Sequence, residues 1–154
     1  MNLKKFDNVK LINAGLWNSS TELEIQFGES GDDDGFLQPD SPQSDSHYEE
    51  STTVRADTIE NFASELNIDH TDIDLIKIEA EGAEPEILEG LGKIRPNHVV
   101  VNGGEERDGK PTGLVVAEKL QPLGYELVGM KKGHILFFTQ RPVGHSAFRN
   151  EFSH

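Results

Sequence analysis

The sequence predicts an α/β fold built on one mostly parallel sheet that ends in an antiparallel hairpin. Short apolar runs alternate with stretches whose apolar residues recur every three to four positions. Strands that alternate with helices in this way are typical of parallel sheets with helices on both faces. The last two apolar runs, residues 125–130 and 135–139, are separated only by a turn, which indicates the hairpin. The 154 residues are enough for a single domain with a modest core.

Composition and charge exclude several functional classes. The chain has 28 acidic and 14 basic residues, a formal net charge of −14, which disfavours nucleic acid and anionic membranes as partners. It has no cysteine, which excludes disulfides, thiolate nucleophiles and cysteine-based metal sites. No apolar run is as long as a membrane span, and the start has no apolar leader. We therefore expect a cytoplasmic protein.

The first third of the chain predicts two strands and a long acidic loop. Residues 9–12 begin one strand, and residues 23–27 alternate apolar and polar side chains like a half-buried strand. Residues 28–53 contain eight acidic residues, no lysine or arginine, and much Gly, Ser and Pro. This composition buries little apolar surface and predicts an acidic mobile loop.

The remaining elements follow from periodicity and capping. A helix is predicted over residues 57–67, capped by Asp57 with Glu60 as its partner. The unbroken apolar run 73–78 predicts a strand covered on both faces. Pro85 begins a second helix, residues 98–101 form the next strand, and a third helix over 111–123 stops at Gly124. Residues 142–154 are expected to be a frayed tail.

Three carboxylates mark the candidate site: Glu79, Glu81 and Glu84 directly follow the apolar strand 73–78. In open α/β sheets, ligands bind beyond the carboxyl ends of the strands. Like charges this close raise one another's pKa, so the cluster indicates that they hold a cation, a metal or a proton. The alternative is that Glu84 only caps the following helix while Glu81 faces water.

Residues 74–84 and 87–90 also carry a family resemblance. They resemble the signature of FkbM-family methyltransferases, roughly Lys-Ile-Asp-x-Glu-Gly-x-Glu followed by Leu and Gly one helix later. Glu79 stands where the family usually has Asp, and Asn102 stands in place of a frequent acid. The resemblance implies a Rossmann-like methyltransferase sheet in which strand 73–78 lies beside strand 98–101. The last strand follows, and the first hairpin strand lies at the outer edge.

The resemblance also implies a cofactor, S-adenosylmethionine, and a methyl acceptor, either a small molecule or a glycan methylated on oxygen. Ala14, Gly15 and Leu16 would line the adenine pocket, and Glu79 would lie near the methionine end of the cofactor. Two carboxylates, Glu81 and Glu84, would face the acceptor, one of them as general base. His134 is a weaker candidate base.

One departure from the family concerns the start of the chain. The family binds its cofactor through a Gly-rich turn after the first strand and an acid after the second, and neither precedes Asn8. We therefore expect a domain truncated at its N-terminus and inactive by itself, with strand 73–78 as an open edge through which copies can associate. Two other functional classes stay open: a non-catalytic remnant of the fold, and a transferase that binds Mg²⁺ through Glu79 and Asn102.

Overall fold

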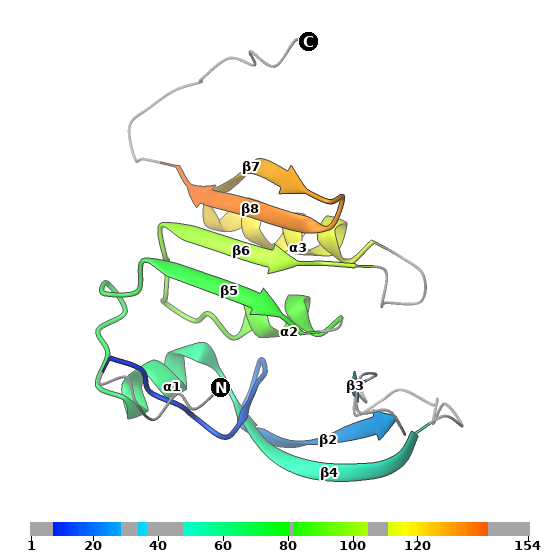
Figure 1. Ribbon diagram of the computed structural model, residues 1–154. Helices are drawn as coiled ribbons and strands as arrows, with labels where there is room; N and C mark the ends of the chain where they lie inside the picture. The colour runs from blue at the N-terminus through cyan, green and yellow to red at the C-terminus, as the bar shows by residue number, and fades with distance from the viewer. Residues whose placement is uncertain (1–7, 29–33, 37–47, 81, 105–110, 142–154) are drawn as a thin grey trace.

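The computed structural model describes residues 8–28, 34–36, 48–80, 82–104 and 111–141 (Figure 1). These residues form two four-stranded sheets and three α-helices. One sheet has the strand order β5-β6-β8-β7 and the other has the order β1-β4-β2-β3. The fold is thus mixed α/β, as the sequence predicts at the level of class, but the strands are divided between two sheets instead of forming one. The predicted mostly parallel sheet is wrong, because four of the six strand pairings in the described residues are antiparallel.

The β5-β6-β8-β7 sheet confirms the predicted second half of the domain. Its strands are β5 (Leu75–Glu79), β6 (His98–Asn102), β7 (Tyr125–Lys131) and β8 (Ile135–Gln140). β5 and β6 run parallel, β8 is antiparallel to β6, and β7 forms the outer edge of the hairpin. This is the strand order implied by the family resemblance, and it leaves β5 as the opposite edge.

Helices cover only one face of this sheet in the described part of the chain. In Figure 1, α2 (Glu84–Glu89) and α3 (Thr112–Leu120) lie behind the strands. Val99 and Val101 face this side and are fully buried. Leu75, on the other face, is 55% exposed, so the prediction that this strand is covered on both faces is wrong. The apolar run reflects its pairing with β6 and one-sided packing, since burial alternates along β5.

The helices largely match their predicted positions. The apolar stripe of α2 and the turn after it is buried: Ile87, Leu88, Leu91 and Ile94 are at most 5% exposed. The helix itself is shorter than the stripe, because it ends at Glu89. α3 continues into a 3₁₀ turn, η2 (Gln121–Leu123), and the chain leaves it at Gly124, whose φ of 89° suits glycine.

The second sheet corrects two predictions. Residues 9–12 are not a strand, and Leu11 is 64% exposed. The strand β1 covers only Gly15–Leu16, where the chain first meets a partner, β4. An apolar run without a neighbouring strand has no ladder to stabilise it.

Residues 28–53 are also more structured than predicted. β3 (Asp34–Phe36) and the start of β4 (Tyr48–Asp57) fall inside this segment, and both pair with β2 (Thr21–Gly28). The predicted loop is therefore wrong at residues 34–36 and 48–53, where pairing with β2 outweighs the polar composition. The rest of it, like the expected tail, lies outside the described residues.

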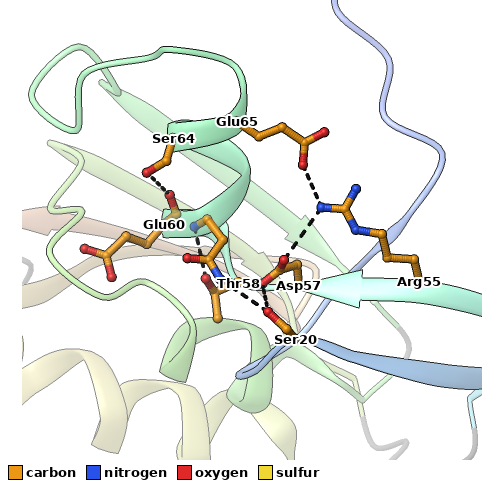
Figure 2. A network of polar contacts seen from close by, with 8 residues as sticks. Ser20, Arg55, Asp57, Thr58, Glu60, Ser64 and Glu65 are labelled. Carbon is orange, nitrogen blue, oxygen red and sulfur yellow. Dashed lines mark hydrogen bonds and ion pairs between the residues drawn. The ribbon is translucent and has the colours of Figure 1, made fainter.

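Helix α1 (Ile59–Glu65) is capped by Thr58, not by Asp57 as the sequence predicts. The Thr58 hydroxyl accepts the Asn61 N–H at 3.0 Å. Asp57 lies one residue earlier and accepts from Ser20, the Thr58 N–H and the Asn61 amide at 2.6–2.8 Å (Figure 2). These bonds, that of Asn61 first, lower the pKa of Asp57. The carboxylate thus joins β2, β4 and α1.

A single core joins both sheets through Trp17. Leu23 and Ala56 from the β1-β4-β2-β3 sheet, and Trp17 directly after β1, belong to the same buried cluster as the helices and strands of the β5-β6-β8-β7 sheet. The contact is close: a Cβ on Gly90 would lie 2.3 Å from the carbonyl oxygen of Trp17. Gly90 therefore lets the end of α2 approach the backbone of the other sheet.

Tyr125 supports a testable prediction about alkaline stability. Its buried hydroxyl donates to the Pro96 carbonyl at 2.7 Å, and burial raises its pKa to about 12 from 10.0. Tyr125→Phe should lower the free energy of unfolding by about 1–2 kcal/mol near pH 8, because the buried carbonyl loses its donor.

The pH dependence tests the same contact. Between pH 10 and about 12 the unfolded chain releases the Tyr125 proton while the folded chain retains it, so the wild-type protein loses stability as pH rises. Tyr125→Phe lacks this loss, so the difference in free energy of unfolding between the two proteins should become smaller as pH rises. Urea titrations at pH 8 and pH 11 measure it; a constant difference would contradict the assignment.

Candidate functional site

The candidate site begins where the parallel strands β5 and β6 end side by side. Glu79 and Asn102 are register partners at this end. The Asn102 amide nitrogen donates to Glu79 Oε1 at 3.0 Å, and Lys77 Nζ pairs with the other oxygen. Lys77 first, then Asn102, lowers the pKa of Glu79. The result is an ionised carboxylate, half exposed, held in a fixed direction at the carboxyl edge of the sheet.

Two buried side-chain oxygens are unusual here. Within the described residues, neither Oδ1 of Asn102 nor Oγ1 of Thr112 has a hydrogen-bond partner. Thr112 is the first residue of α3, and its N–H donates to the Gly104 carbonyl, two residues after the end of β6, at 2.9 Å. Gly103 packs so closely on this helix end that a Cβ there would lie 3.0 Å from the Gly113 nitrogen. Buried atoms without partners are rare in proteins and indicate a place where a ligand or water binds.

Glu84, one of the two predicted catalytic residues, begins α2 directly after the turn from β5. Its side chain is fully buried, with 0% exposure. One carboxylate oxygen accepts the Ala80 N–H at 2.9 Å and the other accepts the Gly82 N–H at 3.0 Å. The geometry agrees with the capping alternative, because the carboxylate closes the turn between β5 and α2. Gly82 has a φ of 99°, which suits glycine in this turn.

The other predicted residues are placed as follows. Glu81 lies outside the described residues. Gly15 and Leu16 belong to the sheet that contains β4, not to the sheet of Glu79, with Ala14 directly before them, and a Cβ on Gly15 would contact Ala56. The structure therefore does not bring the expected adenine residues to Glu79 through a shared sheet.

His134 and Thr112 both lie near the end of β6. The backbone carbonyl of His134 accepts the Gly103 N–H at 2.9 Å, and its side chain is half-buried. The hairpin turn thus borders the site. The sequence analysis did not identify Thr112. The pattern that could have indicated it is a hydroxyl residue at the first position of a helix, after a strand that ends in a Gly-Gly pair.

Metal and membrane features can be assessed for the described ranges alone. There, no three His, Asp or Glu side chains are grouped to hold a metal ion. Asn102 presents its amide nitrogen to Glu79, so in this arrangement the pair does not offer two oxygens to one Mg²⁺. None of the described helices has the length and apolar character needed to cross a membrane.

Comparison with known proteins gives one clear match. The family model described as the methyltransferase FkbM domain matches residues 2–127, most of the chain. No curated protein and no solved structure matches the sequence significantly. The matched range includes both sheets up to β7 and the whole Glu79–Asn102 edge. The chain therefore belongs to the FkbM methyltransferase family.

Proposed function

We propose that this chain contributes the Glu79 side of a methyltransferase site that acts on an oxygen of a small molecule or glycan. FkbM methyltransferases take the methyl group from S-adenosylmethionine, and they require a methyl acceptor. The observation that carries the proposal is the Glu79–Asn102 pair at the carboxyl ends of two parallel strands. This is the position at which α/β sheets bind their ligands, and the carboxylate there is ionised.

The described residues fit one end of S-adenosylmethionine. Its methionine part carries an ammonium and a sulfonium, both of which favour a nearby carboxylate. Glu79 supplies that charge. When bound, the cofactor supplies the electrophilic methyl group. Glu79 and Asn102 would orient its cationic end.

The described residues do not fit the adenosine end. Gly15 and Leu16 form β1 in the other sheet, with Ala14 directly before it, and a Cβ on Gly15 would pack at ordinary contact distance, 3.5–3.8 Å, on Ala56, Leu23 and Val54. We therefore assign no adenine contact to them on structural grounds; their role stays a prediction from the resemblance.

We propose different roles for the two acidic residues that follow Glu79. Glu84 acts as a positioning residue, because its carboxylate fixes the N–H groups of Ala80 and Gly82, which flank Glu81 in the sequence. Glu81 remains the proposed general base toward the acceptor hydroxyl, on the strength of the resemblance alone. His134 is the alternative base, since it borders the end of β6.

A second candidate function is a non-catalytic member of the family. The separation of residues 14–16 from the Glu79 sheet favours it, because a complete cofactor site needs groups for adenosine as well as for methionine. Binding of S-adenosylmethionine distinguishes the two. The catalytic proposal requires binding that depends on Glu79, whereas the non-catalytic member would bind none.

Substitution of the carboxylates tests the proposed site. In a protein that joins this chain to an adenosine-binding segment, Glu79→Gln should weaken S-adenosylmethionine binding at least tenfold, about 1.4 kcal/mol. Glu81→Gln should weaken it less than about threefold, because we propose Glu79 at the methionine end of the cofactor and Glu81 toward the acceptor. Isothermal titration calorimetry measures both, with Glu24→Gln on β2 as an exposed control.

Equal affinities of the Glu79 and Glu81 variants would contradict the assignment of Glu79. The 154-residue chain titrated by itself should give no measurable binding at millimolar cofactor, because the adenosine contacts are missing from its described surface. Micromolar binding by this chain would instead mean that it holds the whole cofactor, and would exclude the non-catalytic candidate.

A further inference from the structure

A pocket of about 260 Å³ lies between α2 and α3. Its lining comes from the end of α2 and the turn after it, and from the last turn of α3 with η2. These segments lead to the amino ends of β6 and β7, whereas Glu79 and Asn102 lie at the carboxyl ends of β5 and β6. The pocket is therefore at the opposite end of the helices, which lie behind the sheet in Figure 1, from the proposed methyl-transfer site.

The floor of the pocket is apolar. Leu88 and Leu91 are at most 3% exposed, and Leu123 packs against the same core cluster. A cavity of roughly 150 Å³ already holds benzene in a protein interior. The space between α2 and α3 is larger, so it suits a group of the size of a phenyl ring joined to a short chain.

Arg95 supplies the pocket with a positive charge, and this side chain is half-buried. Its Nη1 donates to the Gly92 carbonyl at 2.8 Å and to the Ile94 carbonyl at 2.7 Å, which holds the planar group in place. Among the arginines that the structure describes, Arg55 and Arg141 pair with carboxylates, whereas Arg95 pairs with none. Within the same residues no acceptor meets its Nε or Nη2, which lie on one side of the guanidinium. This side is the fork that can hold the two oxygens of a carboxylate.

The other two charged groups of the pocket compensate each other. Lys119 Nζ pairs with Glu89, whose second oxygen accepts from the Asn18 amide at 3.0 Å. Arg95 is therefore left as an uncompensated charge beside an apolar floor. The net charge of −14 repels anions at long range, but salt at about 0.15 M screens charges that lie more than about 8 Å away. The nearby guanidinium therefore decides which small ligands bind.

We propose that this pocket binds a small monocarboxylate with an apolar body. The two carboxylate oxygens accept from Nε and Nη2 of Arg95, and the hydrocarbon covers Leu88, Leu91 and Leu123. Phosphate or acetate would pair with the guanidinium but leave the apolar floor in water. An uncharged molecule of the same shape would cover the floor but leave the guanidinium without an anion. Only a ligand with both parts satisfies both features of the pocket.

Calorimetric titration of the 154-residue chain with hydrocinnamate tests the proposal. This ligand joins a phenyl ring to a carboxylate through a short chain, and hydrocinnamyl alcohol is its uncharged counterpart. Hydrocinnamate should bind with a dissociation constant below about 1 mM, and at least about tenfold more tightly than the alcohol, because the alcohol cannot pair with the fork. In amide NMR spectra it should shift the signals of Leu91, Gly92 and Leu123.

Substitution of Arg95 tests the fork itself. Arg95→Gln should weaken hydrocinnamate binding at least about tenfold, and Arg95→Lys, which keeps the charge but not the fork, should weaken it less. Arg55→Gln, on β4 in the other sheet, is the matched control and should bind hydrocinnamate within about twofold of the wild-type chain.

Each outcome decides the proposal. Absence of hydrocinnamate binding up to about 5 mM overturns it, as do equal affinities for acid and alcohol, or NMR shifts that avoid the pocket residues. An unchanged affinity of Arg95→Gln overturns the assignment of Arg95. If circular dichroism shows that Arg95→Gln does not fold, the comparison of acid and alcohol and the NMR shifts of the wild-type chain still decide. No cofactor takes part, so failure of the proposed methyl transfer would leave these results unchanged.

Discussion

Replacing Glu84 by alanine is expected to lower the free energy of unfolding by about 3 kcal/mol, since two buried N–H groups lose their acceptor at roughly 1–3 kcal/mol each. The carboxylate is fully buried and accepts from Ala80 and Gly82, so water cannot replace it without opening the turn. Glu84→Gln keeps one acceptor oxygen and should cost about half as much. Glu118→Ala, on the exposed side of α3, should change stability by less than about 0.5 kcal/mol.

Urea denaturation followed by tryptophan fluorescence measures these differences. Trp17 is the only tryptophan and is 7% exposed in the folded chain, so its emission reports loss of the shared core. A cost below about 1 kcal/mol for Glu84→Ala would contradict the role of this carboxylate in closing the turn. It would also reopen its assignment to the acceptor side, because a side chain that is not needed for folding is available for chemistry.

Gly90→Ala is expected to be nearly as damaging, at about 2–3 kcal/mol. The new methyl group would lie 2.3 Å from the Trp17 oxygen and 3.2 Å from the Ile87 oxygen. Both contacts are with backbone atoms, so the crowding is relieved only if α2 moves away from the Trp17 segment. The φ of Gly90 is −77°, which any residue adopts, so crowding alone produces the cost.

Gly129→Ala is the matched control for this substitution. A Cβ at Gly129 meets the Phe137 ring at 3.7 Å, an ordinary contact distance. It should therefore change stability by less than about 0.5 kcal/mol. Near-wild-type stability of Gly90→Ala would mean that α2 and the Trp17 segment are not held together as described.

Local patterns made the second half of the fold predictable. The β7–β8 hairpin, the β6 strand and the buried stripe from Ile87 to Ile94 all depend on neighbours in sequence, and each is found as predicted. The strand predicted at residues 9–12 is absent, because a strand also needs a partner strand, which no local pattern supplies. The loop predicted at residues 48–53 is wrong for the opposite reason: this polar segment pairs with β2.

The candidate site could be predicted only in part, for the same reason. Position after an apolar strand identified Glu79, and the resemblance pointed to Asn102. The contact between their side chains depends on the register of β5 and β6, which the sequence alone did not fix. Thr112 joins them through the packing of α3 against Gly103, a contact between backbones with no pattern of its own. The burial of Glu84 could not be predicted, because a charged side chain is usually exposed.

The crowding at Gly90 and the burial of Glu84 change what the family motif tells a reader about this chain. Ile78, Glu84, Leu88 and Gly90 all belong to the motif, and all serve folding here: three fill or admit core contacts and one closes a turn. Among its acidic members in the described residues, Glu79 is the exposed one that lies at the carboxyl end of β5, whereas Glu84 is buried. The motif therefore mainly reflects requirements of the fold. A descendant that exchanged Glu79 alone would keep the rest of the signature but lose the carboxylate that we propose orients the cofactor.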